Sequence, residues 1–388
     1  MATSQIDDDI ISGVRSFVQK EVLPVASDLE HRNEYPQALA DRMKELGLFG
    51  ATIPEQFGGL GLSVSSYARV VEELCRGWMS LSGILNTHLM VAWVIRTFGN
   101  DEQRERFLPA MARGEKRAAF GLTEAHAGSD AQRIRTVAVR RGDQYVVNGT
   151  KMWSTNGRTG TMYGLVVKTD PSADPPHKGM SFLLAEKGPP GCNVSRDLPK
   201  LGYKGVESVE VQFEDFPVPV TNLVGREGEG FRYAMAGLEV GRVNIAARAV
   251  GVAQAAFDAA FRYSQERETF GKPICEHQAI QLKLAEMATK IEAARLLTRS
   301  AAEKKDLGER SDVEAGMAKL FASEICAEVA LEAMRIHGGY GYSQEFPVER
   351  YYRDAPLMVI GEGTNEIQRI VIAKGLLARA GYGRSKDS

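Results

Sequence analysis

Hydrophobic positions recur with a helical period through the first part of the chain. Apolar residues fall three or four positions apart over 10–22, and comparable patterns return over 67–74 and 81–98. This spacing gathers the apolar side chains on one face of each helix. We therefore predict that residues 1–115 form an all-helical domain.

The hydrophobic period then shortens to two. Short alternating runs are bounded by turn residues, which is typical of β-strands. The predicted strands are 136–139, 145–147, 163–168, 180–185 and 206–213. The first two are expected to form a hairpin, and the pair Asn148-Gly149 that follows them favours a turn. Several short strands separated by turns indicate a compact β-barrel or sandwich over residues 116–225.

A helical period returns after the β region and continues to the end of the chain. Ile280, Leu284 and Met287 begin a near-heptad stripe, as in an antiparallel bundle. Residues 311–314, Ser-Asp-Val-Glu, match a capping box and are expected to open another helix. Residues 226–388 are therefore predicted to form a helical bundle. The complete chain then has helical, β and helical domains in an α+β fold.

Composition narrows the class of protein. The 388 residues are 44% hydrophobic and 25% charged, and the net charge of −2 argues against nucleic acid as a main partner. The four cysteines form no CxxC pair, so neither a metal site nor a disulfide framework is expected. The first nine residues are acidic, and no apolar stretch approaches the roughly 18 residues of a membrane span. We expect a cytoplasmic protein without a membrane span.

An acidic residue between two glycines interrupts the helical pattern near the C-terminus. Glu362 lies between Gly361 and Gly363, and the apolar run before it and the helix-forming run at 367–380 are both expected to be buried. The glycines would break the helix and allow close approach of the backbone. A carboxylate held there against apolar surroundings should have a raised pKa, which suits a base that removes a weakly acidic C–H proton. An exposed acid in a glycine-rich loop fits the same pattern, so both interpretations stay open at this point.

Four other segments could carry chemistry. Gly128 and Ser129 can offer backbone N–H groups and a hydroxyl to a phosphate or to the edge of a ring. Trp153 precedes hydroxyl residues and could stack on a planar heterocycle, although an indole is more often part of a core. Arg267 lies just before a long helix, where a guanidinium and a helix N-terminus both favour phosphate. The glycines after His337 either stop a helix or allow a ligand to approach the backbone.

Taken in order, these segments resemble the acyl-CoA dehydrogenase family, and the resemblance extends over essentially the whole chain. It rests on TEAHAGSD at 123–130, NGTKMWST at 148–155, RETFG at 267–271, HQ at 277–278, HGGYG at 337–341 and EGT at 362–364. The family fold has a helical N-terminal domain, a central β-barrel and a C-terminal four-helix bundle, usually assembled as a homotetramer. The resemblance implies the same fold and assembly for this chain.

The resemblance also implies an activity, the FAD-dependent α,β-dehydrogenation of an acyl-CoA thioester to a trans-2-enoyl-CoA. Glu362 matches the base that removes the α-proton while a hydride passes from Cβ to flavin N5. Its backbone N–H, together with a ribityl hydroxyl of FAD, would polarise the thioester carbonyl. Electrons would then pass to an electron-transfer flavoprotein.

Other positions match family residues that contact the cofactor or the substrate. The expected FAD contacts are Phe120, Leu122, Thr123, Gly128, Ser129, Trp153, Thr155, Arg267, Phe270, Gln278, Gly338, Gly339, Thr364 and Glu366. The expected substrate contacts are Ser129, Glu239, Arg242 and Gly363. The FAD contacts between 267 and 339 match positions that reach the cofactor of a neighbouring subunit. FAD is therefore expected to lie at a subunit interface.

Three departures from the family pattern affect the expected site. Gly361 replaces the tyrosine that many members carry before the catalytic acid, which should widen the pocket near the thioester. Gly241 leaves no acid at the position that some branches use instead, so Glu362 is the only well-placed base. Ala125-His126 stands where the family usually has proline, and His126 is expected to be a bystander.

The acyl specificity is the least defined property. Met79, Ser80, Gly83 and Asn86 are expected to line the blind end of the acyl pocket. Gly83 would add room and Asn86 polarity, which hints at a substrate other than a plain long alkyl chain.

Three rival activities remain open at the level of sequence. An acyl-CoA oxidase would use the same chemistry and reoxidise the flavin with oxygen, although oxidases are generally longer chains. A specialised dehydrogenase would act on carrier-bound, branched, cyclic, aromatic or sterol side-chain thioesters. A redox-silent, DNA-binding member of the family is disfavoured by the near-neutral charge and by the presence of Glu362.

Overall fold

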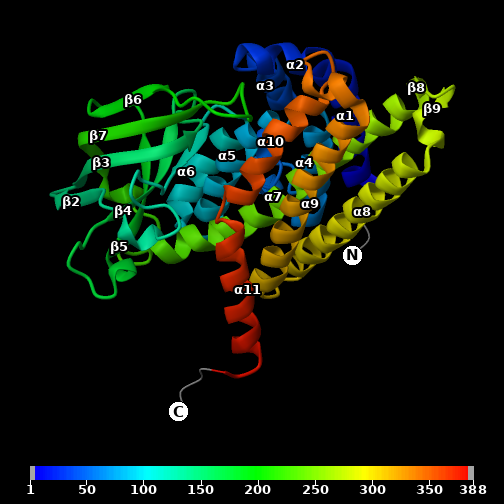
Figure 1. Cartoon of the computed structure of the whole chain (residues 1–388). Coiled ribbons are helices and arrows are strands. Elements are labelled where there is room, and N and C mark those ends of the chain that lie inside the picture. Colours follow the sequence, from blue (N-terminus) through cyan, green and yellow to red (C-terminus); the bar gives the residue numbers. More distant parts are fainter. Residues whose placement is uncertain (1–4, 383–388) are drawn as a thin grey trace.

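The computed structural model describes residues 5–382, and the ends of the first and third predicted domains, 1–4 and 383–388, lie outside the described residues. Along this range a helical unit is followed by a curled sheet and then by long helices (Figure 1). The sheet lies to one side of the helices, and α7 extends from it into the helical part. The predicted order of helical, β and helical units is confirmed.

The N-terminal helices bury the apolar faces that their sequence period predicts. They are α1 (Gln5–Phe17), α2 (Leu23–Arg32), α3 (Gln37–Glu45), α4 (Val64–Gly77), α5 (Met79–Phe98) and α6 (Asp101–Ala112), with a π-helical turn at Val18–Val22. The helix α5 is buried along most of its length, because it packs against α7 on one side and against the sheet on another. This helix therefore lies at the junction of the three units.

The central strands form one curled sheet. They are β1 (Ala118–Gly121), β2 (Val137–Arg141), β3 (Gln144–Thr155), β4 (Met162–Lys168), β5 (Met180–Glu186), β6 (Cys192–Asp197) and β7 (Ser208–Pro219). Their order is β1-β4-β2-β3-β7-β6, and β5 also pairs with β4. The predicted hairpin is present as β2 and β3, joined by Gly142 and Asp143. Apolar side chains from both sides of the curl meet in a separate small core.

The turn predicted at Asn148-Gly149 is wrong. Both residues lie inside β3, where the register against β7 shifts between Val147 and Gly149. Gly149 has a φ of 146°, and a Cβ there would lie 2.6 Å from Cα of Thr136, the residue just before β2. The pair therefore forms a β-bulge that permits close approach of two strands, which is another conformation that glycine allows.

Long helices form the C-terminal unit. They are α7 (Gly230–Glu266), α8 (Gln278–Asp306), α9 (Asp312–His337), α10 (Val348–Ile360) and α11 (Asn365–Arg379), with a two-stranded ribbon of β8 (Glu268–Thr269) and β9 (Lys272–Pro273) after α7. Helix α9 packs against α7, α8, α10 and α11. The helix expected after Ser311 is present, but the capping box is not, because the Ser311 hydroxyl donates to Glu239 instead.

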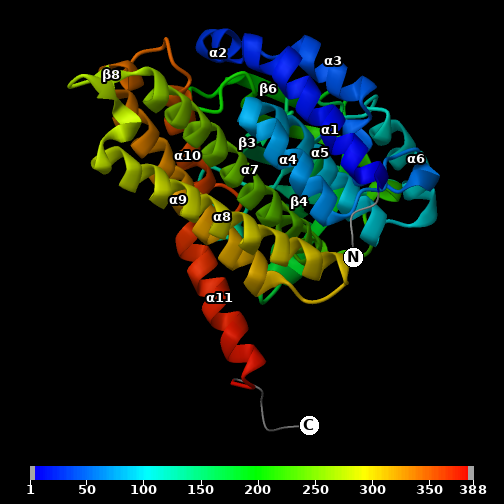
Figure 2. The ribbon, with the colours of Figure 1, turned by 90° about the vertical axis from the view of Figure 1, so that its right-hand side faces the viewer.

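The expectation that the last helix is buried is wrong for the single chain. In α11 only Asn365, Gln368 and Gly375 are buried, whereas Ile370 and Leu376 are exposed. The helix extends away from the body of the molecule (Figure 2). Ile370 and Leu376 are therefore left uncovered by the described part of this chain, although α11 still packs on α9.

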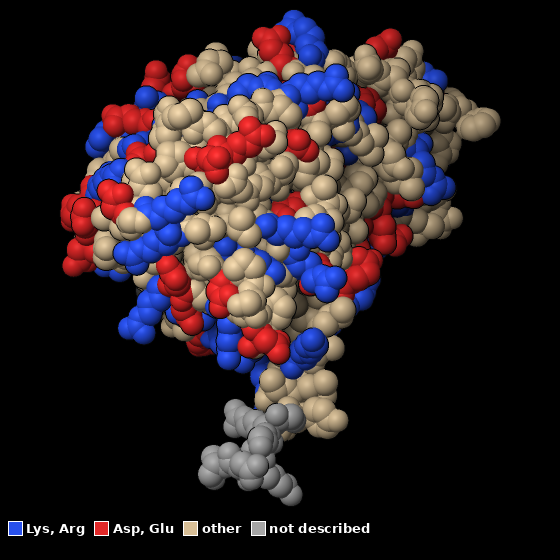
Figure 3. Space-filling view, turned by 90° about the vertical axis from the view of Figure 1, so that its left-hand side faces the viewer, with Lys and Arg blue, Asp and Glu red and all other residues tan. Residues whose placement is uncertain are grey.

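The surface charge is mixed. Lysine and arginine side chains alternate with aspartate and glutamate across the face shown in Figure 3, and neither sign gathers into a broad field. In the range that the structure describes, no helix has both the length and the apolar character to cross a membrane.

Candidate active site

The turn that carries Glu362 joins α10 to α11. Glu362 itself has a left-handed backbone, with φ of 53°, and Gly363 follows with φ of 89°. Gly361, by contrast, is extended, with φ of −65° and ψ of 151°. A non-glycine residue in the left-handed region costs conformational energy and persists only where its surroundings hold it. The backbone strain of this turn therefore falls on the acidic residue.

The Glu362 carboxylate reaches across to α7, where a glycine makes room for it. A Cβ on Gly241 would lie 1.8 Å from Glu362 Oε2, so any larger residue there would displace the carboxylate. Asn86 of α5 donates to Oε1 at 2.5 Å. Oε2 is fully buried and has no hydrogen-bond partner. One carboxylate oxygen is therefore held in place and the other is left without a donor.

Burial raises the pKa of the Glu362 carboxyl above its ordinary value. The positive charges of Arg248, Lys319 and Arg242 and the Asn86 hydrogen bond all act in the opposite direction. Desolvation outweighs them because it penalises the ionised form of a carboxyl group. The carboxyl therefore has the raised proton affinity that was expected from its place between apolar segments.

A buried lysine holds this turn from the α9 side. Lys319 is 0% exposed and its Nζ donates to three acceptors, Val359 O at 3.1 Å, Gly363 O at 2.9 Å and Asn365 Oδ1 at 2.8 Å. The first acceptor lies at the end of α10, the second in the turn and the third at the start of α11. Burial lowers the pKa of Lys319 to about 8. Lys319 thus ties together the segments before and after Glu362.

Replacing Lys319 by methionine is expected to destabilise the protein and to slow its reaction. Three buried acceptors would lose their donor, and unsatisfied buried polar groups cost about 1–3 kcal/mol each, so we expect a loss of about 2–4 kcal/mol after partial relaxation. Urea unfolding with paired stopped-flow assays measures both effects.

Lys20→Met is the matched control, because Lys20 is an exposed lysine far from the turn. It should change neither the unfolding midpoint nor the rate. A Lys319→Met protein with wild-type stability and rate would show that these hydrogen bonds do not position Glu362.

Two predicted substrate residues lie on α7 beside Gly241. Arg242 has a buried Nε without a hydrogen-bond partner, and none of the described residues forms an ion pair with it. Glu239 is occupied differently, because its Oε1 accepts from Lys305 at 3.0 Å and from Ser311 at 2.9 Å. Arg242 therefore has donor capacity left for a ligand, whereas Glu239 fastens α7 to the ends of α8 and α9.

The expectation that Gly83 adds room to an acyl pocket is wrong. A Cβ on Gly83 would lie 1.5 Å from the hydroxyl oxygen of Tyr203, so the tyrosine ring already fills that space. Ser80 donates to Lys204 O, and Met79 is buried. Of the four residues expected at the blind end, only Asn86 contacts Glu362 directly.

The predicted flavin contacts of the β unit lie on β1, in the loop that follows β1 and at the end of β3. Trp153 is 56% exposed with a left-handed φ of 60°, so the alternative that it belongs to the core is wrong. Thr123 O accepts from the backbone of Met152, which places the two motifs side by side. Thr155 lies close enough to hydrogen-bond the Tyr203 hydroxyl, which connects this group to the Glu362 cluster. Gly128 and Ser129 are exposed in the adjoining loop, while Phe120 and Leu122 are partly or fully buried.

A buried ion pair braces that loop. Lys151 Nζ donates to Glu124 Oε1 at 2.8 Å and to Leu122 O at 3.2 Å. Glu124 also accepts from the backbone of Arg135 and from Thr136. Exposed His126 contacts Arg133 O and stays a peripheral loop residue.

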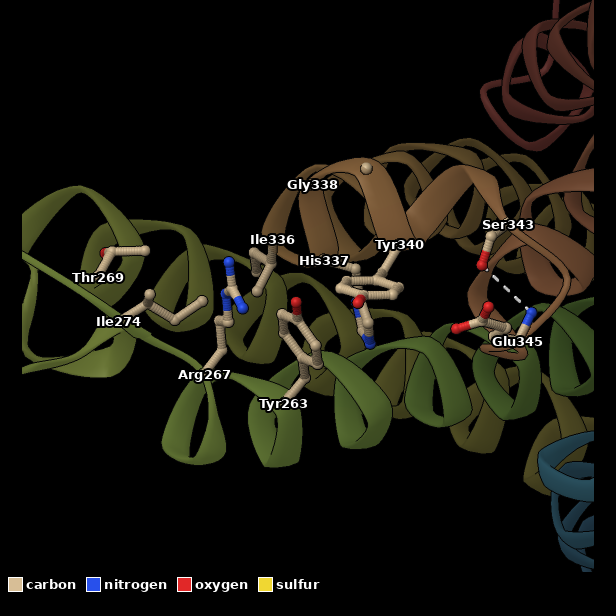
Figure 4. A pocket seen from close by; sticks show the side chains of 11 residues that line it. Tyr263, Arg267, Thr269, Ile274, Ile336, His337, Gly338, Tyr340, Ser343 and Glu345 are labelled. Atoms are coloured by element: carbon tan, nitrogen blue, oxygen red, sulfur yellow. Dashed lines mark hydrogen bonds between the residues drawn. The ribbon is translucent and has the colours of Figure 1, made fainter.

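Most of the remaining predicted cofactor residues lie near the C-terminal end of α7. Arg267, Gly338 and Gly339 line a pocket of about 580 Å³ with Tyr263 and His337 (Figure 4). Phe270 projects from the β8–β9 ribbon and is 97% exposed. Gln278 is exposed at the start of α8, and Thr364 and Glu366 lie instead at the start of α11. The predicted cofactor contacts therefore lie in two places, one near Glu362 and the β unit and the other near the C-terminal end of α7.

Sequence reasoning missed Arg248, Asn244 and Lys319. Arg248 and Asn244 are the only polar residues within 243–253, and Lys319 falls among the small apolar residues of α9. A polar residue inside an otherwise apolar helical stretch is a signal of a buried contact, because such groups need partners. That signal was available in the sequence.

Comparison with known proteins agrees with this arrangement. Family models of the acyl-CoA dehydrogenase N-terminal, middle and C-terminal domains match residues 5–115, 119–216 and 228–377. The order of the helical, β and helical units is the order of these three family domains. The chain belongs to the acyl-CoA dehydrogenase family and is an oxidoreductase.

Individual relatives are similar over nearly their whole length. An acyl-CoA dehydrogenase of Bacillus subtilis is 44% identical, with 94% of this chain and 96% of the relative covered. The butyryl-CoA dehydrogenase of Megasphaera elsdenii superposes with a TM-score of 0.94 at 38% identity, covering 97% and 99%. A chain in the structure of the electron transferring flavoprotein of Acidaminococcus fermentans gives the same TM-score at 40% identity, also covering 97% and 99%.

Proposed function

We propose that this protein dehydrogenates short acyl-CoA thioesters at Cα–Cβ, with Glu362 as the base. The observation that carries the proposal is the buried Glu362 Oε2, which has no donor and occupies the space left by Gly241. A base that must remove a weakly acidic proton needs such a dry position and a raised pKa. The butyryl-CoA dehydrogenase of similar structure supports a short acyl group.

The backbone of the same turn can serve the thioester carbonyl. Among the described residues, no backbone or side-chain acceptor takes the N–H of Glu362. A donor fixed beside a forming enolate oxygen strengthens as charge develops there. The proton thus moves to the Glu362 carboxylate while the backbone N–H of the same residue holds the carbonyl.

The residues present fit FAD, provided that two chains share it. Gly241 marks the level of Glu362 on α7, and Arg267 follows 26 residues later, which is about 39 Å along a helix at 1.5 Å per residue. That separation exceeds the length of one dinucleotide. The exposed Trp153 and the unpaired Arg267 are suited to a planar ring and to a diphosphate respectively. When bound, the flavin would supply the hydride acceptor.

An oligomer would unite the two groups of residues and cover the exposed apolar surface. Exposed leucines and isoleucines occur on the outer helices, namely Leu282, Leu296 and Leu297 on α8, Leu331 on α9, and Ile370, Leu376 and Leu377 on α11. Exposed apolar groups on neighbouring helices favour burial in an interface. We infer a homotetramer that hands its electrons to an electron-transfer flavoprotein, since a chain of this fold occurs in the A. fermentans structure.

The proposal is tested on the purified protein. We expect bound FAD that bleaches anaerobically with butyryl-CoA and yields the trans-2-enoyl thioester. Slow reoxidation by oxygen and fast reoxidation by an electron-transfer flavoprotein would distinguish a dehydrogenase from an oxidase. A protein that binds no FAD, or whose flavin no acyl thioester reduces, would refute the proposal.

Gly361 leaves space beside the base. Because Gly361 is extended, it does not require glycine for its φ, and a Cβ there would meet only Leu357, at 3.2 Å from its carbonyl oxygen. We expect Gly361→Ala to fold and bind FAD normally, and Gly361→Tyr to shift preference from branched towards straight acyl groups. The kcat/KM values for butyryl-CoA and isobutyryl-CoA in both variants measure the shift. Equal losses for both substrates would end the idea that substrate uses this space.

A further inference from the structure

A second polar group lies on α7 two helical turns after Gly241, the residue that faces the Glu362 carboxylate. Gly241, Asn244 and Arg248 are spaced by three and four residues, so they form one stripe. Asn244 is 3% exposed and Arg248 is 4% exposed. Arg248 Nε donates to Asn244 Oδ1 at 2.7 Å, and Nη2 donates to Ser82 O at 3.3 Å. The guanidinium thus bends back along α7 towards the base.

Arg248 has no acidic partner. Within residues 5–382, no carboxylate lies within ion-pair distance of its guanidinium. The charge of Glu362 still acts on it, and the Tyr203 hydroxyl lies within hydrogen-bonding reach. A buried guanidinium cannot shed its proton, so such a group normally has a carboxylate or phosphate beside it. Because no described carboxylate forms an ion pair with Arg248, its guanidinium is available to an anionic group of a ligand.

The charges around Glu362 lead to the same requirement. Arg242, Arg248 and Lys319 all act on the Glu362 carboxylate. Glu239 and Asp312 also act on Arg242, and Glu366 and Glu324 also act on Lys319, whereas Glu362 is the only carboxylate that acts on Arg248 among the described residues. Lys319 already donates to three carbonyl and amide oxygens. Arg242 is expected to contact the CoA part of the substrate. Arg248 is the cation left over. The surplus of positive charge in a desolvated region favours a ligand that brings negative charge into it.

The position of Arg248 limits the length of that ligand. Along α7, Asn244 lies about 4.5 Å and Arg248 about 10.5 Å beyond Gly241, at 1.5 Å per residue. The guanidinium lies between these levels because it reaches back to Asn244. An extended chain advances roughly 1.2 Å per bond. The carboxylate oxygens of a five-carbon diacyl group are four bonds from Cα, and with a hydrogen bond added they fall inside this interval.

We propose that Arg248, supported by Tyr203 and Asn244, binds a carboxylate at the far end of a short acyl group, so that the preferred thioester is that of a dicarboxylic acid of about five carbons. The inference rests on the proposed function and names its substrate class. Tyr203 is itself fixed for this role. Its ring fills the space beside Gly83, and its backbone N–H donates to buried Asp354 Oδ1 at 2.6 Å.

The test compares butyryl-CoA, 4-hydroxybutyryl-CoA and glutaryl-CoA on wild type, Arg248→Gln and Arg248→Lys. In the wild type, we expect kcat/KM for glutaryl-CoA to exceed that for butyryl-CoA at least tenfold, with the hydroxy thioester between them. Arg248→Gln should lower the glutaryl-to-butyryl ratio about 10- to 100-fold, mainly through KM, because a charge-assisted hydrogen bond is lost. Arg248→Lys should restore part of the ratio.

Binding provides a readout that does not depend on turnover. In Glu362→Gln protein, where the thioesters stay unreacted, calorimetry should show tighter binding of glutaryl-CoA than of butyryl-CoA. Adding Arg248→Gln should abolish that difference. Flavin content and circular dichroism verify that each variant is folded, and the wild-type preference decides the question even if Arg248→Gln does not fold.

Three outcomes would overturn the inference. A wild type that prefers butyryl-CoA would overturn the inference but would leave the proposed dehydrogenation standing. Equal losses for all thioesters in Arg248→Gln, with a shifted pH profile, would mean that Arg248 acts only through the charge of Glu362. Failure of every thioester to reduce the flavin would overturn the proposed function together with this inference.

Discussion

Glu362→Gln is expected to lower the rate of flavin reduction by several orders of magnitude while leaving the fold and FAD content unchanged. The amide keeps the shape of the side chain and can still contact Asn86, but it cannot accept the α-proton. General-base catalysis contributes about 10² to 10⁴. That range is a lower limit here, since Gly241 offers no second acid on α7. Anaerobic stopped-flow absorbance measures the rate directly.

The pH profile gives an independent signature of the same residue. Because only the ionised carboxylate accepts a proton, and burial raises the pKa of Glu362, the wild-type rate should rise with pH above the ordinary glutamate range of about 4.3. That rising limb should be absent in Glu362→Gln and present in Glu102→Gln, which changes an exposed acid on α6. Bleaching of the Glu362→Gln flavin at a near-wild-type rate would refute the assignment.

Arg267→Ala is expected to yield protein that is poor in FAD and that dissociates into smaller species. Arg267 lines the pocket at the end of α7, and its guanidinium pairs with no carboxylate in the described part of the chain. A diphosphate bound there would lose a bidentate partner in a partly enclosed place, and a charged group left unpaired is costly. Flavin absorbance per chain and analytical ultracentrifugation measure the two effects together.

Arg262→Ala is the matched control, since Arg262 is an exposed arginine of α7 that does not line the pocket. It should retain FAD and the oligomeric state. Fully loaded monomers in either wild type or Arg267→Ala would contradict cofactor binding across an interface.

The helices were predictable because their buried faces repeat at short range in the sequence. Residues 81–98, for example, are rich in apolar side chains and form most of the buried α5. The hairpin of β2 and β3 was equally local, since two residues close it. Such features depend on neighbours in the chain, and periodicity records them.

The errors have a common cause, which is that distant segments compete for the same groups. Ser311 donates to Glu239 rather than capping its own helix, and Gly149 makes room for Thr136 rather than turning the chain. Gly83 likewise leaves space that Tyr203 fills from more than a hundred residues away. A local pattern shows that a residue is special but does not show which partner will use it.

In the candidate site, too, the features set by neighbouring residues were predictable and those set by distant segments were not. The acid between two glycines was recognisable, and so was its raised pKa, because both follow from the immediate sequence. The clamp of Lys319 on the turn and the gap at Gly241 depend on α9 and α7 meeting α10. These contacts arise only from the packing of helices that the sequence leaves unconnected.

The length of α7 has a consequence for inheritance. If its two ends serve different cofactors of the assembly, as proposed, then a lesion at Arg267 harms the neighbour's centre and a lesion at Glu362 harms the chain's own. Two alleles with these separate defects would complement each other wherever mixed assemblies pair a sound base with a sound arginine. Two alleles defective at the same end would not. With cofactors shared in this way along the 37 residues of α7, complementation between two defective alleles would depend on the assembly and not on the single polypeptide.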